Sequence, residues 1–114
     1  MKEFKKKEEE IVQLISLPGY CLATDKITCE GKRVGYMYRE EPDNERDSGW
    51  RFFSGEEDQE YVDDPENIEM FSLNTIANYD PDIISLLNAP YGSAFEREEG
   101  SGDFVGIEFP ESDD

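Results

Sequence analysis

Hydrophobic and polar residues alternate most regularly along residues 33–39. Val34, Tyr36 and Tyr38 fall on one side of this stretch, and Arg33, Gly35, Met37 and Arg39 fall on the other. A period of two is typical of a strand with one buried face. The pattern therefore predicts a half-buried strand whose inner side carries Val34 and the two tyrosines.

A compact aromatic strand is predicted at residues 50–53, where Trp50 and Phe52 share a face. The preceding Asp47-Ser48-Gly49 has the composition of a turn, and the polar stretch 40–48 is predicted to be a charged loop between the two strands. Further short strands are predicted at residues 20–24, 26–29, 69–73, 91–98 and 103–109, the last two forming a hairpin through residues 99–102.

Helical signals occur at the start of the chain and in its second half. Residues 1–16 have helix-forming composition with apolar residues near one face, which predicts an amphipathic helix that Pro18-Gly19 ends. Asp64-Pro65-Glu66 and Asp80-Pro81-Asp82 each combine a capping Asp, a Pro suited to the first helical turn and a favourable acid. The second of these is predicted to open a helix that buries Ile83, Ile84, Leu86 and Leu87, and residues 74–79 a short helical turn.

These elements predict an α+β fold, a small single domain with a mainly antiparallel sheet, an N-terminal helix and one or two short helices. A length of 114 residues is enough for one domain. The segments are an amphipathic helix at residues 1–18, an α+β domain at 19–109 and a frayed acidic tail at 110–114. The predicted core consists of Tyr20, Leu22, Val34, Tyr36, Tyr38, Trp50, Phe52, Ile83, Leu86 and Leu87, with Trp50 near its centre.

The charge balance argues against a phosphate-binding surface as the main purpose of this domain. Eleven Lys and Arg stand against 29 Asp and Glu, which gives a formal net charge of -18. Such a charge argues against DNA or RNA as a partner. The longest uncharged run, residues 11–24, is too short for a membrane helix and contains Pro18-Gly19. With no secretory signal in the sequence, we expect a cytoplasmic protein that does not bind membranes.

The absence of histidine removes several kinds of chemistry. The sequence has none, which excludes Ser-His and Cys-His hydrolases and leaves Cys21 and Cys29 without the further ligands of a structural zinc site. The two cysteines are predicted to stay reduced. No cofactor is predicted.

One acidic loop partly matches the pattern of a calcium site, but two of its positions do not fit. Asp43, Glu45 and Asp47 alternate as the first ligands of an EF-hand do, but Ser48 stands where glycine is required and Ser54 where a bidentate Glu is required. Paired carboxylates such as Glu56 and Glu57 would serve acid–base catalysis only if burial raised one pKa beside a substrate pocket. A small carboxylate-based enzyme or a divalent-metal-binding protein therefore stays as the alternative function.

Four motifs carry a family resemblance. They are Val34-Gly35-Tyr36-Met37-Tyr38-Arg39-Glu40, Asp47-Ser48-Gly49-Trp50-Arg51-Phe52-Phe53-Ser54-Gly55-Glu56-Glu57, Asn74-Thr75-Ile76-Ala77-Asn78-Tyr79-Asp80 and Gly92-Ser93-Ala94-Phe95-Glu96-Arg97. In this order they resemble the bacterial domain of unknown function 2185, which is grouped with the immunity proteins of polymorphic toxin systems as the thirty-third numbered immunity family. The resemblance covers residues 19–97. It implies a non-enzymatic binding protein that neutralises a toxin, and it supplies no catalytic residues.

Charge and resemblance together predict a protein partner, such as a basic toxin domain, that binds an acidic face, and they leave the oligomeric state open. This face is predicted to be built by the loops 40–47 and 56–64, which flank the strand of Trp50. Arg51 is expected to be exposed or paired with neighbouring acids. The predicted partner-binding residues are Asp43, Glu45, Asp47, Arg51, Glu56, Glu57, Asp58 and Glu60.

Overall fold

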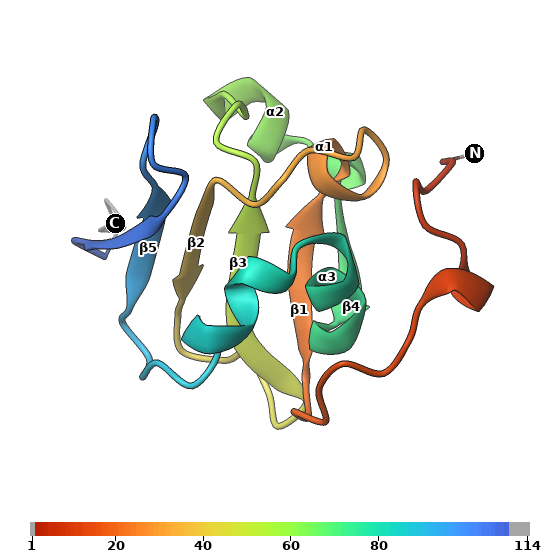
Figure 1. The fold of residues 1–114 in the computed structure, drawn as a ribbon, viewed down its shortest axis with the longest axis horizontal. Coiled ribbons are helices and arrows are strands. Elements are labelled where there is room, and N and C mark those ends of the chain that lie inside the picture. The colour runs from red at the N-terminus through yellow and green to blue at the C-terminus, as the bar shows by residue number, and fades with distance from the viewer. Residues whose placement is uncertain (1, 110–114) are drawn as a thin grey trace.

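The computed structural model describes residues 2–109. In this range the strands form one six-stranded sheet in the order β4-β1-β3-β2-β5-β6 (Figure 1). The strands are β1 Tyr20–Thr24, β2 Tyr36–Arg39, β3 Asp47–Phe53, β4 Ile68–Ser72, β5 Ala94–Arg97 and β6 Phe104–Ile107. Only β1 and β3 pair in parallel among the described strands, and the other neighbours are antiparallel. The α+β class and the mainly antiparallel sheet are therefore confirmed.

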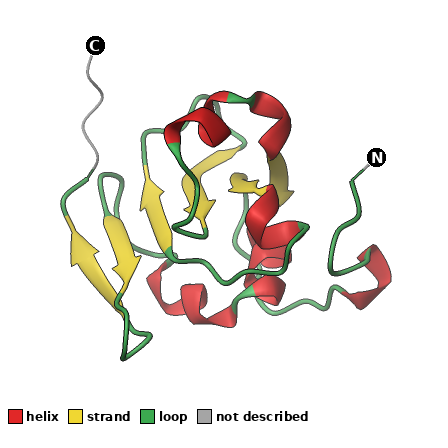
Figure 2. Ribbon diagram, turned by 90° about the horizontal axis from the view of Figure 1, so that it is seen from above, coloured by secondary structure: helices red, strands yellow, loops and turns green. Residues whose placement is uncertain are grey.

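Short helices cover one face of this sheet and leave most of the other uncovered. The helical elements are η1 Glu8–Glu10, α1 Asp25–Thr28, α2 Gln59–Asp63, η2 Pro65–Asn67, α3 Leu73–Tyr79 and η3 Pro81–Leu86, where η marks a 3-10 helix. In Figures 1 and 2, α3 and η3 lie against the same face of the sheet, while α2 lies beyond the end of β3. No helix among the described residues is long and apolar enough to span a bilayer.

Both predicted Asp-Pro caps are present. The side chain of Asp64 accepts a hydrogen bond from the backbone N–H of Glu66, and that of Asp80 accepts one from Asp82. In each case the proline occupies the first helical turn, where its missing N–H costs nothing. The helix after Asp80 is a 3-10 helix that buries Ile83 fully.

The core forms between the helix-covered face of the sheet and the helices. Trp50 and Phe52 are 0% and 1% exposed, which confirms their predicted shared inner face. Val34, Ile83 and Leu87 are also buried as predicted. The prediction is wrong for Tyr20, Leu22, Tyr36, Tyr38 and Leu86, which are only partly buried. The rest of the buried apolar cluster is Cys21, Ala23, Ile27, Met37, Leu73 and Ile76.

The inner and outer sides of β2 are the reverse of the prediction. Met37 pairs with Phe52 and is fully buried, whereas Tyr36 and Tyr38 lie on the opposite face. The predicted alternation breaks at Gly35, whose backbone passes so close to the residue that follows β3 that an added Cβ would lie 2.0 Å from the carbonyl oxygen of Ser54. Val34 lies before this contact and outside β2, so it does not share the alternation of the tyrosines.

Three local predictions are wrong. The amphipathic helix predicted at 1–16 is not formed: the described residues 2–16 contain one 3-10 turn, η1, and their main chain from residue 5 onward bonds to α1 and α3. Residues 26–29 belong mostly to α1, whose first turn holds Asp25, and not to a strand. Asp47-Ser48-Gly49 is part of β3 and is buried, not a turn. The tail predicted at 110–114 lies outside the described residues.

Both cysteines are free thiols, as predicted. Cys21 is fully buried, which raises the pKa of its thiol well above the usual range, and burial also raises the pKa of the partly exposed Cys29. We expect an aromatic disulfide reagent to modify one thiol of the native protein slowly and the second only after unfolding. Cys29→Ser should abolish the reaction of the native state, and equal rates at both thiols would contradict this assignment.

Candidate functional site

The sheet face opposite α3 and η3 carries a cluster of aromatic rings. Tyr36 on β2 pairs with Phe53 on β3, and their ring centroids are 5.6 Å apart. Tyr38 stacks on Phe53 at 5.7 Å and meets the edge of Phe109 at 5.5 Å. We call this surface the open face, and by strand register it comprises Leu22, Tyr36, Tyr38, Phe53, Met70, Val105 and Ile107.

The open face is accessible to a partner. Met70, Val105 and Ile107 are 61%, 38% and 36% exposed, and the aromatic rings at its centre are half-buried. Exposed apolar side chains gathered on one face of a soluble domain often mark a site of interaction. The face therefore has the apolar component of a binding site.

Two shallow depressions lie on the open face. The first, about 430 Å³, lies between the aromatic cluster and α2 and has Glu57, Asp58 and Glu96 on its border. The second, about 110 Å³, lies beside Tyr38 and is bordered by Glu40. Arg51 is the one cationic side chain among the described residues that line them. The aromatic surface is thus framed by carboxylates.

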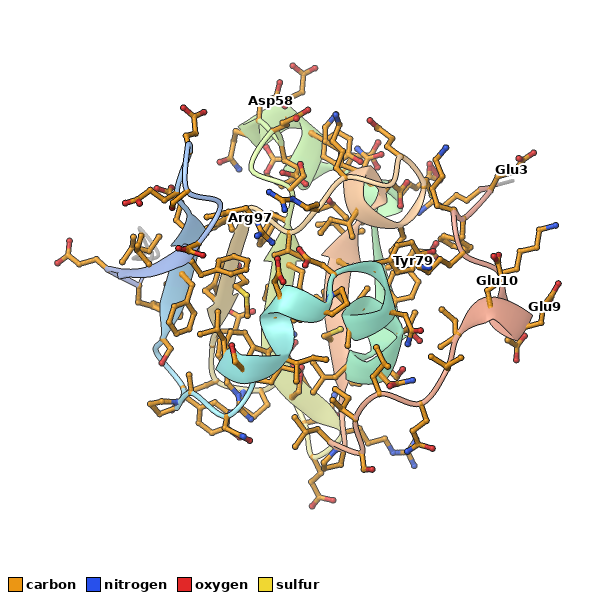
Figure 3. All side chains as sticks on the ribbon, in the orientation of Figure 1. Glu3, Glu9, Glu10, Asp58, Tyr79 and Arg97 are labelled. Atoms are coloured by element: carbon orange, nitrogen blue, oxygen red, sulfur yellow. The ribbon has the colours of Figure 1, made fainter. Side chains whose placement is uncertain are left out.

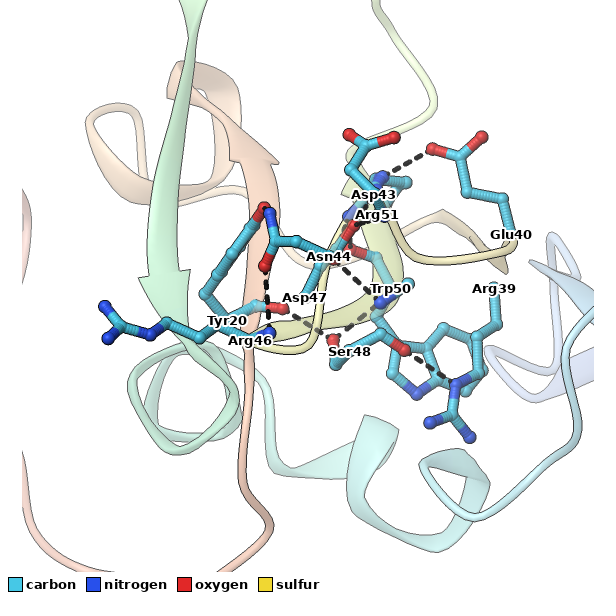
Figure 4. Close-up of polar contacts among 11 residues, drawn as sticks. Tyr20, Arg39, Glu40, Asp43, Asn44, Arg46, Asp47, Ser48, Trp50 and Arg51 are labelled. Atoms are coloured by element: carbon cyan, nitrogen blue, oxygen red, sulfur yellow. Dashed lines mark hydrogen bonds and ion pairs between the residues drawn. The ribbon is translucent and has the colours of Figure 1, made fainter.

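The guanidinium of Arg51 forms ion pairs with two carboxylates near the start of β3 (Figure 4). Its two terminal nitrogens donate to the Asp47 carboxylate at 2.9 and 2.7 Å, and its Nε donates to Glu40 at 2.6 Å. Asp47 also accepts the backbone N–H groups of Asp43 and Gly49, both at 2.9 Å. The hydrogen bonds from Arg51 hold the pKa of Asp47 far below its usual range. Both charges are therefore present at neutral pH and already paired.

Glu57 stabilises the C-terminal end of β3, opposite to the end where Asp47 lies. Its carboxylate accepts the hydroxyl of Thr24 and the backbone N–H groups of Ser54 and Gly55, the last two at 2.8 and 2.9 Å. Burial alone would raise the pKa of Glu57, but these hydrogen bonds outweigh it and lower the pKa. A general acid at neutral pH needs the opposite shift, so neither Glu57 nor Asp47 is tuned for that role.

The predicted partner-binding residues differ in exposure and fall into three groups. Asp47 and Arg51 are 5% and 3% exposed and belong to the interior, so they do not form part of a surface. Glu57 is half-buried and holds its own loop. The exposed members are Asp43, Glu45, Glu56, Asp58 and Glu60.

The two acidic loops do not form one continuous face. They lie at opposite ends of β3, whose seven residues separate them by about 20 Å at roughly 3.3 Å per residue. Within the second loop, Glu56 is paired with Lys32 at 3.2 Å and Asp58 caps α2 by accepting the N–H of Tyr61. Of these exposed acids, Asp58 borders the open face.

The open face was not predicted, because the alternation of residues 33–39 placed Tyr36 and Tyr38 in the core. Glu40 and Glu96 border the same surface; Glu40 lies in the predicted acidic loop 40–47, whereas Glu96 was not predicted to take part. Burial and the nearby charge of Glu40 raise the pKa of Tyr38 to about 12, so its phenol is neutral and able to donate a hydrogen bond. The one available signal was Gly35, since a glycine inside a strand pattern often marks a close backbone approach that breaks the alternation.

No group of three or more His, Cys, Asp or Glu residues is placed to hold a metal ion within residues 2–109. The acidic residues that suggested calcium, Asp43, Glu45 and Asp47, do not converge, because the Asp47 carboxylate points to Arg51.

Comparison with known proteins gives one family. Residues 21–108 match the family described as Immunity protein Imm33 domain, which confirms the grouping inferred from the four motifs. Neither the curated proteins nor the solved structures contain a match to the chain. The matched range includes nearly all of the sheet and excludes residues 2–19.

Proposed function

The chain belongs to the Imm33 immunity protein family, and from this premise we propose that it is a non-enzymatic binding protein that neutralises a toxin by direct contact. The proposed partner is a protein with a basic surface. The net charge of -18 supports this choice, because a strongly negative protein attracts a cationic partner and repels acidic ones.

The observation that carries the proposal is the open face with its border of carboxylates. Aromatic residues are enriched at the centres of protein interfaces, where they bury a large area with few rotatable bonds. Tyr36, Tyr38 and Phe53 would form such a centre, and the rim acids Glu40, Asp58 and Glu96 would meet Lys or Arg of the partner. A cation of the partner could also lie over a tyrosine ring.

The proposal is tested by isolating the partner. The tagged protein should retain one specific protein when it is purified from its source cell, and co-expression should restore growth of cells that express that partner. If the retained protein is not toxic to cells, or if its toxicity is unchanged by this chain at equal expression, the immunity proposal is wrong.

We expect the rim charges to control the rate of association with this partner. A variant carrying Asp58→Asn and Glu96→Lys keeps the α2 cap and changes the charge by +3. At low salt its association should be about tenfold slower, and the difference should shrink at high salt because steering is screened. Dissociation should change less. Stopped-flow or surface-binding kinetics measures both rates.

The matched control is Glu3→Gln with Glu9→Lys, which makes the same charge change at two exposed positions of the N-terminal segment (Figure 3). Equal slowing in both variants would mean that net charge alone steers the partner. Unchanged association in both would mean that the acids serve only solubility. Either result excludes the rim as the contact.

A further inference from the structure

The N-terminal segment, residues 2–19, lies along α3 and β4 as an extended strap. Figures 1 and 2 show it at the side of the domain, passing α3 before it enters β1. None of its residues is buried, and Val12, Leu14 and Leu17 are 57%, 44% and 38% exposed. Two apolar side chains of the strap do contact the domain, since the ring of Phe4 meets the edge of Phe71 at 5.7 Å and Ile15 packs partly buried against the core.

Polar side chains of α3 bind the main chain of the strap. Val12 donates its N–H to Asn78 Oδ1 at 3.0 Å and accepts hydrogen bonds from the Nδ2 atoms of Asn74 and Asn78 at 3.0 and 2.8 Å. Two residues later, Leu14 donates its N–H to Asn74 Oδ1 at 2.7 Å. The two amides thus pair with the strap as a neighbouring strand would.

A third group extends this row toward the start of the chain. The hydroxyl of Tyr79 accepts the N–H of Lys6 at 3.1 Å and lies 3.3 Å from the carbonyl oxygen of the same residue. In Figure 3, Tyr79 lies on the side of α3 toward the strap. We call Asn74, Asn78 and Tyr79 the amide row.

The chemistry of the amide row is that of main-chain recognition. Asn74 and Asn78 are four residues apart and therefore share one side of the helix. A primary amide offers both a donor and an acceptor, as does a phenol, so each group matches an N–H or C=O of an extended chain. These bonds do not depend on the side chains that the extended chain carries.

Charge adds a preference for a basic ligand. Lys2 of the strap forms ion pairs with Asp25 at 3.0 Å and with Glu69 at 3.3 Å. The body of the domain carries the negative charge of the chain, since residues 1–10 contain four lysines and four glutamates. An extended segment with lysine near its start is therefore complementary to this side of the domain.

We propose that the amide row is a binding site for an extended, lysine-bearing peptide segment, and that the strap occupies it in cis. Asn74, Asn78 and Tyr79 lie inside the residues that match the family, whereas the strap lies outside them. The site is thus part of the domain, and its occupant is an addition to the domain. A segment supplied by another molecule, including a second copy of this chain, replaces the strap when the strap is released. This site is separate from the open face and does not depend on the proposed toxin contact.

The test uses the full chain with Val12→Pro and Leu14→Pro. Proline has no N–H, so these changes remove two of the three backbone donors that bind Asn78 and Asn74, and the N–H of Ile15, 3.1 Å from Asn74 Oδ1, is kept. Ile11 is already extended, with φ -80° and ψ 121°, as the residue before a proline prefers. The matched control is Gln13→Pro, because the backbone N–H of Gln13 makes no hydrogen bond among the described residues.

Hydrogen exchange and peptide binding are measured on these variants. Hydrogen exchange of residues 5–15 should become at least tenfold faster in the double-proline variant and stay near the original rate in the control, with the melting temperature of the domain retained in both. A fluorescent peptide of residues 2–17 should then bind the double-proline variant at least tenfold more tightly than the original protein. In the original protein the strap competes at an effective concentration of about millimolar.

Adding Asn74→Ala and Asn78→Ala to the double-proline variant should abolish peptide binding. The proposal is overturned if the released domain does not bind the peptide, or if binding survives loss of both asparagines. It is also overturned if the strap stays protected in the double-proline variant, since other contacts would then hold it. A stable dimer of the original chain in which straps are exchanged would support the site, with the second copy as its source of peptide.

Discussion

Trp50→Ala is expected to lower the free energy of unfolding by about 3–5 kcal/mol, a large share of the 5–15 kcal/mol typical of domains. Trp50 is fully buried near the middle of the sheet, and its ring stacks on Phe52 and Phe95 with centroids 6.0 and 6.4 Å apart. Its indole N–H donates to the carbonyl oxygen of Leu87 at 3.2 Å, which ties η3 to the sheet. The substitution leaves a large cavity and an unpaired carbonyl.

Urea unfolding followed by circular dichroism measures this loss. Trp50→Phe keeps most of the ring packing and loses the hydrogen bond, so we expect it to cost less than half as much as the alanine variant. Tyr91→Ala provides a matched aromatic control, because Tyr91 is 53% exposed and should cost well under 1 kcal/mol. If the alanine variants at positions 50 and 91 are equally stable, Trp50 is not a core residue.

Arg51→Met is expected to destabilise the protein by about 3–5 kcal/mol, because it leaves the carboxylate of Asp47 buried without its cation. The side chains of this pair are 4% and 0% exposed. Methionine fills much of the same volume, so the loss would come mainly from the unpaired charge. The double variant Asp47→Asn with Arg51→Met should recover part of the loss, because the introduced amide is neutral and its oxygen still accepts a backbone N–H.

The same pair predicts a pH dependence. The folded-state pKa of Asp47 is depressed, so its stabilising contribution is present above the unfolded pKa of about 4 and is lost as the pH falls through the folded value. The difference in unfolding free energy between the original protein and Arg51→Met should therefore be largest at pH 7 and become smaller below about pH 4. A difference that stays constant from pH 7 to pH 3 would mean that the lost guanidinium packing, and not the ion pair, accounts for the effect.

The motifs that identify the family are mainly structural in this chain. Asp47 and Arg51 form a buried ion pair, and Asp80 caps η3 while accepting the N–H of Val34 at 2.9 Å and pairing with Arg97 at 2.5 Å. These residues fix the ends of the strands on which the open face is built. Other motif residues reach surfaces where another molecule could bind: the tyrosines of the first motif and Phe53 of the second lie on the open face, and the third motif supplies the amide row.

Local signals in the sequence were sufficient where one residue decides the conformation. The Asp-Pro caps at Asp64 and Asp80 were predicted correctly, because a capping side chain and the first helical turn lie within three residues of each other. Trp50 and Phe52 were placed correctly because β3 keeps a regular alternation at this point. The same local reasoning predicted the hairpin of β5 and β6.

Local signals were insufficient where two conformations are close in free energy. A helix of 16 residues is marginal in water, and in this protein the strap bonds instead to Asn74 and Asn78, about 60 residues away in sequence. Residues 26–29 had a weak strand signal, but most of them belong to α1, which follows Thr24 in the chain. The hydroxyl of Thr24 bonds to Glu57, more than 30 residues away. Tertiary contacts decide such cases.

The sequence by itself determined the α+β class, the immunity family, the aromatic strand of Trp50 and the caps of two short helices, because composition, motif order and nearest-neighbour chemistry carry that information. Only the tertiary structure decided which acids are buried, which tyrosines form the open face, and that the first residues are a strap on the amide row. Each of these depends on contacts between residues far apart in the chain. The backbone approach at Gly35 lies where the predicted alternation breaks, and the tyrosines of β2 lie on the candidate binding surface, not in the core.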